Sequence, residues 1–274
     1  MNVIITLTTI PTRLITFHNY DIRYCIESLL NQNFGEYEIH FNIPEKHNQS
    51  GEPYILPDWL VEMEQSNSKL NIFRTEDYGP ITKLLPTLKR VTDPETIIIV
   101  VDDDMVYHSE LINEHIKNRE KWPNNPVGYD GLTSLNDDGS GRNTFNNSRD
   151  YFFSANGLAS YVQILQHYKS VSYRRGMFEE DIYDFISEYG AWCDDTSLSA
   201  YFSMKKIPRV VTYYELDEVA QDFDEWLGVV GKSFPIVRGT DHETMEGCHI
   251  FRHEEKDKHK FQQLNVFLSK GFEK

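Results

Sequence analysis

The sequence predicts an α/β fold in which a mixed, mostly parallel sheet is flanked by helices. Residues 96–101 (TIIIVV) form a run without polar alternation, which is typical of a central strand buried on both faces. Upstream, a short apolar strand at 3–7, an amphipathic helix within 20–31 and a strand at 37–43 form a βαβ opening. We therefore expect helices on both faces of the sheet.

Local patterns define the elements in chain order. Apolar residues recur at helical spacing between 20 and 31, and alternation with period two predicts the strand at 37–43. A third strand is expected at 70–75, and Pro80 suits the first turn of the helix that follows. Ser109 is the expected N-cap of the next helix. The other expected helices span 58–65, 109–121, 179–189, 196–205 and 257–267.

We expect one domain over 1–274, because no Gly-, Ser- or Pro-rich linker and no repeat divides the 274 residues. The least apolar window, 136–150, predicts a mobile loop and a candidate lid. The sequence leaves open whether the chain is a domain of a longer polypeptide.

The charge balance limits the partners. The chain has 27 Lys and Arg residues against 43 Asp and Glu residues, a net charge of -16. This excess of negative charge argues against nucleic acid or an anionic membrane surface as the main partner. An anionic ligand must then be bound locally, through a metal ion and a few cationic side chains.

The three cysteines are isolated and indicate neither a disulfide framework nor a zinc site. Cys25, Cys193 and Cys248 form no CxxC pair, so a reducing compartment is expected. The N-terminus lacks a basic leader, and no stretch of about 18 apolar residues occurs. We expect a soluble, cytoplasmic protein without a membrane span.

Three adjacent carboxylates, Asp102, Asp103 and Asp104, follow the apolar run. Ligands of α/β sheets bind at the carboxyl ends of strands, and crowded carboxylates repel unless a cation holds them. In an extended segment Asp102 and Asp104 point the same way and share one ion, while Asp103 faces a sugar or ribose hydroxyl. Oxygen ligands favour Mn²⁺ or Mg²⁺. The alternative is a solvated acidic turn.

The trio resembles the DxD motif of GT-A fold nucleotide-sugar glycosyltransferases, which have a Rossmann-like sheet. Two further stretches are similar to a family 2-like branch, namely TLTTIPTR at 6–13 and DYGPITKLLPTL at 77–88. The order and spacing of the three motifs carry the resemblance over about the first 110 residues. Beyond them it rests on CDDTSLSAYFSMKKIP at 193–208.

The resemblance implies a nucleotide-sugar-binding half, 1–108, and an acceptor-binding half, 109–274. It implies that Thr8, Thr9 and Arg13 line the nucleotide pocket, that Asp77 accepts from the base, and that Lys83 reaches the diphosphate or donor sugar. Cationic Arg13 and Lys83 suit phosphate, although either can be an ordinary surface charge. Asp77 can equally be a turn residue before Gly79 and Pro80.

A second acidic pair, Asp194 and Asp195, opens the motif of the acceptor half. The resemblance implies that the pair lies beneath the sugar and that Asp195, with Asp194 beside it, is the catalytic base of an inverting enzyme. In a retaining enzyme the same residue only positions the acceptor or steadies the sugar cation. The alternative is a helix N-cap, for which Asp before Thr and Ser is typical.

Histidines and aromatic residues complete the candidate site. The resemblance implies that a C-terminal histidine completes the metal shell, and His242 and His249 are the candidates, with a surface or structural role as the alternative. His253 and His259 are expected to be solvated. The aromatic residues offer either a stacking platform for the acceptor or plain core. These are Tyr151, Phe152, Phe153, Trp192 and Trp226.

The expected function is therefore transfer of a hexose from a UDP-sugar, with UDP-galactose or UDP-glucose favoured, to a glycan or glycoconjugate hydroxyl with Mn²⁺ or Mg²⁺. Two alternatives are a metal-dependent nucleotidyltransferase or phosphohydrolase and an inactive sugar-binding or scaffold domain. The chain lacks a Gly-rich phosphate loop near its N-terminus, which disfavours the nucleotidyltransferase.

Overall fold

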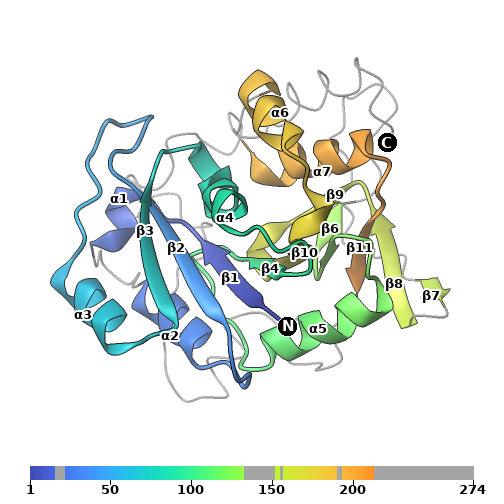
Figure 1. The fold of residues 1–274 in the computed structure, drawn as a ribbon, viewed down its shortest axis with the longest axis horizontal. Helices are drawn as coiled ribbons and strands as arrows, with labels where there is room; N and C mark the ends of the chain where they lie inside the picture. Colours follow the sequence, from blue (N-terminus) through green and yellow to red (C-terminus); the bar gives the residue numbers. More distant parts are fainter. Residues whose placement is uncertain (16–21, 133–151, 155–156, 190–192, 213–274) are drawn as a thin grey trace, which may run out of the picture.

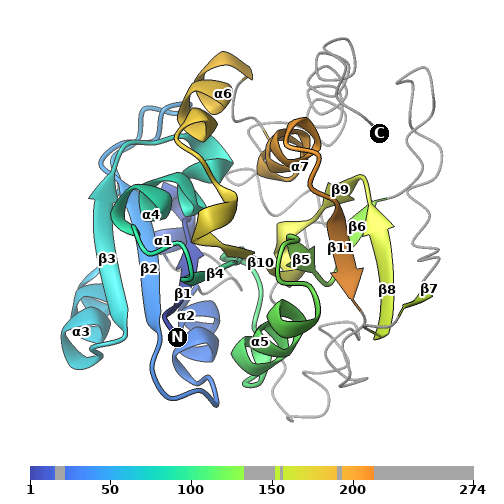
Figure 2. The same cartoon turned by 45° about the vertical axis from the view of Figure 1, so that its right-hand side comes forward.

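The computed structural model describes residues 1–15, 22–132, 152–154, 157–189 and 193–212. Within this part, nine strands form one sheet in the order β3-β2-β1-β4-β10-β5-β11-β8-β7, and β6 pairs separately with β9 (Figures 1 and 2). The strands are β1 (Val3–Leu7), β2 (Glu38–Pro44), β3 (Leu70–Thr75), β4 (Ile97–Val100), β5 (Val127–Gly128), β6 (Gly131–Leu132), β7 (Phe152–Ser154), β8 (Gly157–Val162), β9 (Ile164–Leu165), β10 (Val171–Arg174) and β11 (Arg209–Thr212).

Helices cover both faces of the sheet, as the sequence predicts. The cores on the two faces show that α2, α3 and α5 pack on one face and α4, α6 and α7 on the other (Figure 1). The helices are α1 (Pro11–Leu14), α2 (Arg23–Leu30), α3 (Asp58–Ser66), α4 (Leu85–Arg90), α5 (Leu111–Lys121), α6 (Asp181–Tyr189) and α7 (Asp194–Met204), with 3-10 turns η1 (Gly79–Lys83), η2 (His167–Lys169) and η3 (Arg175–Met177). No described helix has the length and apolar character needed to span a membrane.

Strand β4 is the central strand that the apolar run predicts. Ile97 and Ile99 belong to the core beneath α2 and α5, while Ile98 and Val100 belong to the core beneath α4 and α7. Alternate residues of a strand point to opposite faces, so a strand buried on both faces needs apolar residues throughout. The α/β class with a mixed sheet and flanking helices is confirmed.

Strand direction changes beyond β4. Strands β3, β2, β1 and β4 run parallel, whereas β10 pairs antiparallel with β4 at Val100 and Val171. Further along, β5 and β11 are parallel, and β8 is antiparallel to β11. The first four strands thus bring their carboxyl ends to one edge, where the candidate site lies.

Two helix starts differ from the sequence prediction. Helix α5 begins at Leu111 with Glu110 as its N-cap and no side-chain cap, so the assignment of Ser109 as N-cap is wrong. The Ser109 hydroxyl accepts a hydrogen bond from Asn33 Nδ2 at 3.1 Å, which ties it to the end of α2. Helix α7 begins at Asp194, two residues before the expected start, so both aspartates lie within its first turn.

Candidate active site

The three consecutive aspartates lie in a turn at the carboxyl end of β4. The strand ends at Val100, and a turn holds Asp103 and Asp104. The extended backbone that we assumed for Asp102 to Asp104 is therefore wrong, because the chain turns soon after it leaves the sheet. Each carboxylate of the trio meets a different set of protein groups.

The segment that follows β1 holds Asp103 and Asp104. Thr9 Oγ1 donates to Asp103 Oδ2 at 2.5 Å, and the Arg13 guanidinium pairs with Asp103 Oδ1. The same guanidinium lies 3.3 Å from Asp104 Oδ2. Asp103 is buried, whereas the Asp104 side chain is 38% exposed. Because β1 and β4 are adjacent and parallel, their carboxyl ends meet, which brings Thr9 and Arg13 to the trio.

Lys83 connects the trio to the second acidic pair. It is the last residue of η1, and its ammonium pairs with Asp102 and lies 2.7 Å from Asp194 Oδ2. The side chains of Lys83 and Asp194 are both nearly buried, at 8% and 10% exposed. A single lysine thus bridges two carboxylates, one from each half of the chain.

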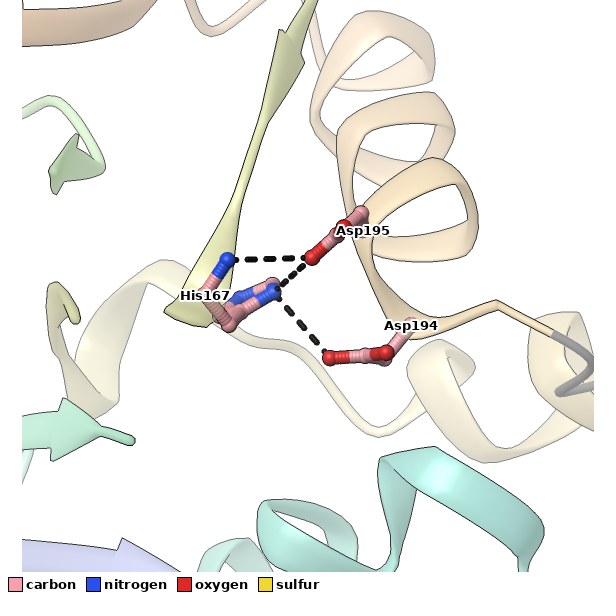
Figure 3. Close-up of side chains that lie close together, drawn as sticks. All are labelled: His167, Asp194 and Asp195. Atoms are coloured by element: carbon pink, nitrogen blue, oxygen red, sulfur yellow. Dashed lines mark hydrogen bonds and ion pairs between the residues drawn. The ribbon is translucent and has the colours of Figure 1, made fainter. Parts of the chain in front are cut away.

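Asp194 and Asp195 also meet His167, which lies at the start of η2 (Figure 3). The His167 ring Nδ1 lies 2.7 Å from Asp195 Oδ1 and 3.1 Å from Asp194 Oδ2. The main-chain N–H of His167 donates to the same Asp195 oxygen at 3.0 Å, and Nε2 lies 2.8 Å from the Tyr173 hydroxyl. We name the resulting group the acidic network; it comprises Asp102, Lys83, Asp194, Asp195 and His167.

The start of α7 places the second acidic pair. Cys193 is the N-cap of this helix, so the alternative in which one of the aspartates is the N-cap is not what the structure shows. Carboxylates in a first helical turn interact favourably with the partial positive charge of the N-terminus. The Ser199 hydroxyl of α7 accepts from the Leu165 N–H of β9 at 3.1 Å, which fixes the helix beside His167.

Burial and charge pairing shift the pKa values of the network in opposite directions. Burial, opposed by Lys83, raises the pKa of Asp102 to about 6. Burial acts to raise the pKa of Asp194, but the positive charges of Lys83 and His167 outweigh it and hold this pKa well below its usual range. Burial disfavours the charged form of His167, but Tyr173 and the two aspartates raise its pKa well above the ordinary value. At neutral pH His167 is therefore an imidazolium and Lys83 an ammonium, beside the ionised carboxylate of Asp194.

The charges around the trio fit a divalent cation. In the part of the chain that the structure describes, the five carboxylates of the trio and the acidic pair are paired with three cations, from Arg13, Lys83 and His167. Among these described residues, negative charge therefore exceeds positive charge, and carboxylate oxygens suit Mg²⁺ or Mn²⁺. Asp102 and Asp104, the two more exposed carboxylates of the trio, are the residues that fit this ion.

A second set of metal-type ligands fits less well. Ligand atoms of His167, Asp194 and Asp195 lie within 4.8 Å of one another. However, Nδ1 of His167 is within hydrogen-bonding distance of both carboxylates, and a nitrogen that donates a proton has no lone pair for a metal. The Lys83 ammonium also lies against Asp194. With Nδ1 protonated, His167 offers no nitrogen ligand at this position and only the two carboxylates remain.

Thr8 and Asp77 are bonded within the protein. Thr8 Oγ1 donates to the Asn42 carbonyl at 2.7 Å. Asp77 accepts from the main-chain N–H groups of Asn48 at 2.6 Å and Gly79 at 2.7 Å, which is the turn role that the sequence left open. Asp77 also lines an open surface hollow of about 650 Å³ beyond the carboxyl ends of β2 and β3, together with Arg74 and other polar residues.

Several predicted residues lie outside the part of the chain that the structure describes. These are His242, His249, His253 and His259, the aromatic residues Tyr151, Trp192 and Trp226, the segment 136–150 and the helix at 257–267. Phe152 and Phe153 belong to β7.

Sequence reasoning missed His167 of the acidic network and Tyr173, which contacts it. His167 follows a two-residue strand and belongs to no motif with metal-ligand or catalytic spacing. Its partner Asp195 is 28 residues further along the chain. No local sequence signal indicates His167, because only the packing of β9 and η2 against the start of α7 brings His167 and Asp195 together.

No protein-family model matches the sequence, and no curated protein matches it either. Among solved structures, S. aureus TarS 1-349 is similar to this chain with a TM-score of 0.49 and 14% identity, covering 99% of this chain and 73% of that one. Its complex with UDP-GlcNAc has a TM-score of 0.45 and 14% identity, covering 98% and 73%. A 4-diphosphocytidyl-2C-methyl-D-erythritol synthase from Anaerococcus prevotii DSM 20548 has a TM-score of 0.47 and 13% identity, covering 78% of this chain and 86% of that one.

Proposed function

We propose that the chain is a metal-dependent glycosyltransferase that moves a hexose from a UDP-sugar, UDP-galactose or UDP-glucose, to a hydroxyl of a glycan. The observation that carries this proposal is the acidic network itself. Lys83 joins Asp102, just beyond the carboxyl end of β4, to Asp194, at the start of α7 in the other half. Two carboxylate groups at one sheet edge, linked by a buried cation, suit a reaction between an anionic donor and a neutral alcohol.

The donor side of the site must bind and stabilise a diphosphate. Asp102 and Asp104 would hold the metal ion, which when bound supplies a Lewis acid for the departing diphosphate. Arg13 presents a forked set of donors beside this position, and Lys83 offers a point charge. The net negative protein needs these local cations, because its overall field repels a nucleotide.

The acceptor side needs a base within hydrogen-bonding reach of a sugar hydroxyl. Asp195 suits this role because one of its oxygens is bound by His167 and its side chain is 18% exposed. In the proposed step the acceptor oxygen forms a bond to the anomeric carbon while the bond from that carbon to the diphosphate oxygen breaks. The hydroxyl proton passes to Asp195, and the electron pair of the broken bond leaves with UDP.

The first test is binding of UDP with and without Mn²⁺, measured by calorimetry and by thermal shift. We expect UDP, UDP-galactose or UDP-glucose to bind only when Mn²⁺ is present. We expect Asp104→Ala to abolish this Mn²⁺-dependent binding. Asp184→Ala, which removes an exposed carboxylate from α6, is the matched control and should bind as the wild type does.

The second test separates the reaction classes by their products. A glycosyltransferase releases UDP and a glycosylated acceptor, whereas a nucleotidyltransferase releases pyrophosphate from a nucleoside triphosphate. Indifference of the wild type to every nucleotide, or an unaltered Mn²⁺ response in Asp104→Ala, would contradict the proposal.

A further inference from the structure

We propose that His167 is a positioning residue that orients the Asp195 carboxylate for its role as base. This inference rests on the proposed glycosyl transfer and adds a residue that neither the motifs nor the resemblance points to. Its basis is geometric. The ring Nδ1 and the main-chain N–H of His167 both lie within hydrogen-bonding distance of the same oxygen of Asp195, at 2.7 and 3.0 Å (Figure 3).

Two donors on one oxygen fix the carboxylate in rotation. Asp195 Oδ1 accepts from both His167 groups, and within the described residues Oδ2 of Asp195 has no hydrogen bond to protein. The Asp195 side chain is 18% exposed, whereas that of His167 is 1% exposed. The buried histidine therefore occupies one oxygen of the carboxylate and leaves the second oxygen for an acceptor hydroxyl.

The histidine is itself held rigidly. Its Nε2 lies 2.8 Å from the Tyr173 hydroxyl, and the two rings stack at 6.2 Å between centroids with a 29° interplanar angle. Tyr173 in turn stacks on Phe202 at 5.5 Å and 11°. Phe202 belongs to α7, the helix that carries Asp195, so the aromatic stack fixes the ring relative to the carboxylate. A carboxylate base held in this way is already oriented before it accepts a proton.

His167 is charged at neutral pH, which suits positioning more than proton removal. Burial opposes its ionisation, but Tyr173 and the two carboxylates raise its pKa well above the ordinary value. An imidazolium has a proton on both ring nitrogens and cannot accept another. In the proposed step the acceptor proton goes to the second oxygen of Asp195, and both protons of His167 stay in place.

Two substitutions separate hydrogen bonding from packing. His167→Asn places an amide N–H close to the former position of Nδ1 but loses the ring, whereas His167→Phe keeps a ring of similar volume and loses both ring N–H donors, which leaves the main-chain N–H in place. If Nδ1 positions Asp195, the kcat of His167→Asn should lie within about tenfold of the wild-type value. The kcat of His167→Phe should be about 10²-fold lower, which is within the usual range for loss of a general base. Both variants should keep Mn²⁺-dependent UDP binding and the donor KM.

His115→Asn is the matched control. His115 is another fully buried histidine, bonded through Nε2 to Ser170 Oγ at 2.8 Å, and it lies outside the acidic network. Its replacement should lower the melting temperature without altering kcat. A kcat loss equal to that of His167→Phe would assign the effect to general disruption of the fold and overturn the inference.

The remaining outcomes also decide. A wild-type kcat in His167→Phe would overturn the inference, and so would an equal loss of kcat in His167→Asn and His167→Phe. In either case, Mn²⁺-dependent binding of UDP would leave the proposed function intact. A wild type that neither binds UDP nor turns over would remove the proposed function and this inference with it. If His167→Phe does not fold, nitrogen NMR of the wild-type ring decides, because an unprotonated Nδ1 would rule out donation to Asp195.

Discussion

Lys83 shows how a single residue can determine the electrostatics of a site. Its ammonium pairs with Asp102 and Asp194, and the side chains of Lys83 and Asp194 are nearly buried, whereas that of Asp102 is 28% exposed. A buried ion pair contributes little net stability compared with apolar packing, but loss of one partner leaves an uncompensated charge. The lysine is therefore more important to the folded state than its single charge implies.

We predict that Lys83→Met lowers the free energy of unfolding by about 3–5 kcal/mol near neutral pH, because the nearly buried Asp194 and the partly exposed Asp102 lose their shared cation. The loss should shrink on acidification. The pKa of Asp194 is depressed in the wild type, so its stabilisation is present above the unfolded value of 3.8 and is lost as pH falls through the folded pKa. Denaturant unfolding at a series of pH values measures the effect.

Lys83→Met/Asp194→Asn is the control for this prediction. With one of the two carboxylates made neutral, the double variant should be more stable than Lys83→Met at neutral pH. A loss in Lys83→Met that does not depend on pH would show that packing of the lysine stem, and not its charge, is what matters.

At the scale of elements, close approach of short strands positions the acceptor half of the site. Gly131 of β6 lies so near β9 and β11 that an added Cβ would meet the Ile164 carbonyl at 2.8 Å and a methyl group of Val211 at 2.9 Å. Strand β9 leads directly into η2, which carries His167. The absence of a side chain at Gly131 thus lets β6 pack where the site requires it.

We predict that Gly131→Ala lowers the free energy of unfolding by about 1–3 kcal/mol through overpacking. It should also lower the kcat of the proposed reaction, because β9 and η2 must shift. Gly35→Ala is the control: a Cβ there meets nothing within 4 Å, so the change should be neutral or stabilise by roughly 0.4–1 kcal/mol. Thermal unfolding of both variants measures this, and equal behaviour would refute the close-packing argument.

At the scale of the whole molecule, one sheet joins the two halves of the chain. Strand β4 of the first half pairs with β10 of the second, and α4 shares a core with α6 and α7. Neither half can therefore lose its packing without exposing apolar surface of the other. This continuity supports the expectation of a single domain.

We predict that the protein unfolds in one cooperative thermal transition, with calorimetric and van't Hoff enthalpies that agree. Scanning calorimetry, with fluorescence and circular dichroism as independent probes, provides the measurement. Two resolved transitions, or probes that disagree on the midpoint, would indicate that the halves fold separately and would contradict the single-domain expectation.

Local patterns were sufficient for the first four strands of the sheet and for most of the helices, but not for strands β7 to β11 or for the exact ends of elements. The apolar run at 96–101 became β4, and the strand at 70–75 has the bounds that were predicted. Ser109 was wrongly assigned as a cap, because Asn33 binds its hydroxyl from a distant part of the chain. The trio was assumed to be extended, because sequence spacing does not show where a strand ends and a turn begins.

The sequence by itself determined the α/β class and the location of three aspartates at the end of a buried strand, because both follow from the order of apolar and polar residues along a few turns or strands. Tertiary structure alone decided that Lys83 lies between two carboxylates and that His167 binds Asp195. The physical reason is that these contacts join residues far apart in the chain, and only the packing of the sheet against α7 brings their side chains within hydrogen-bonding distance.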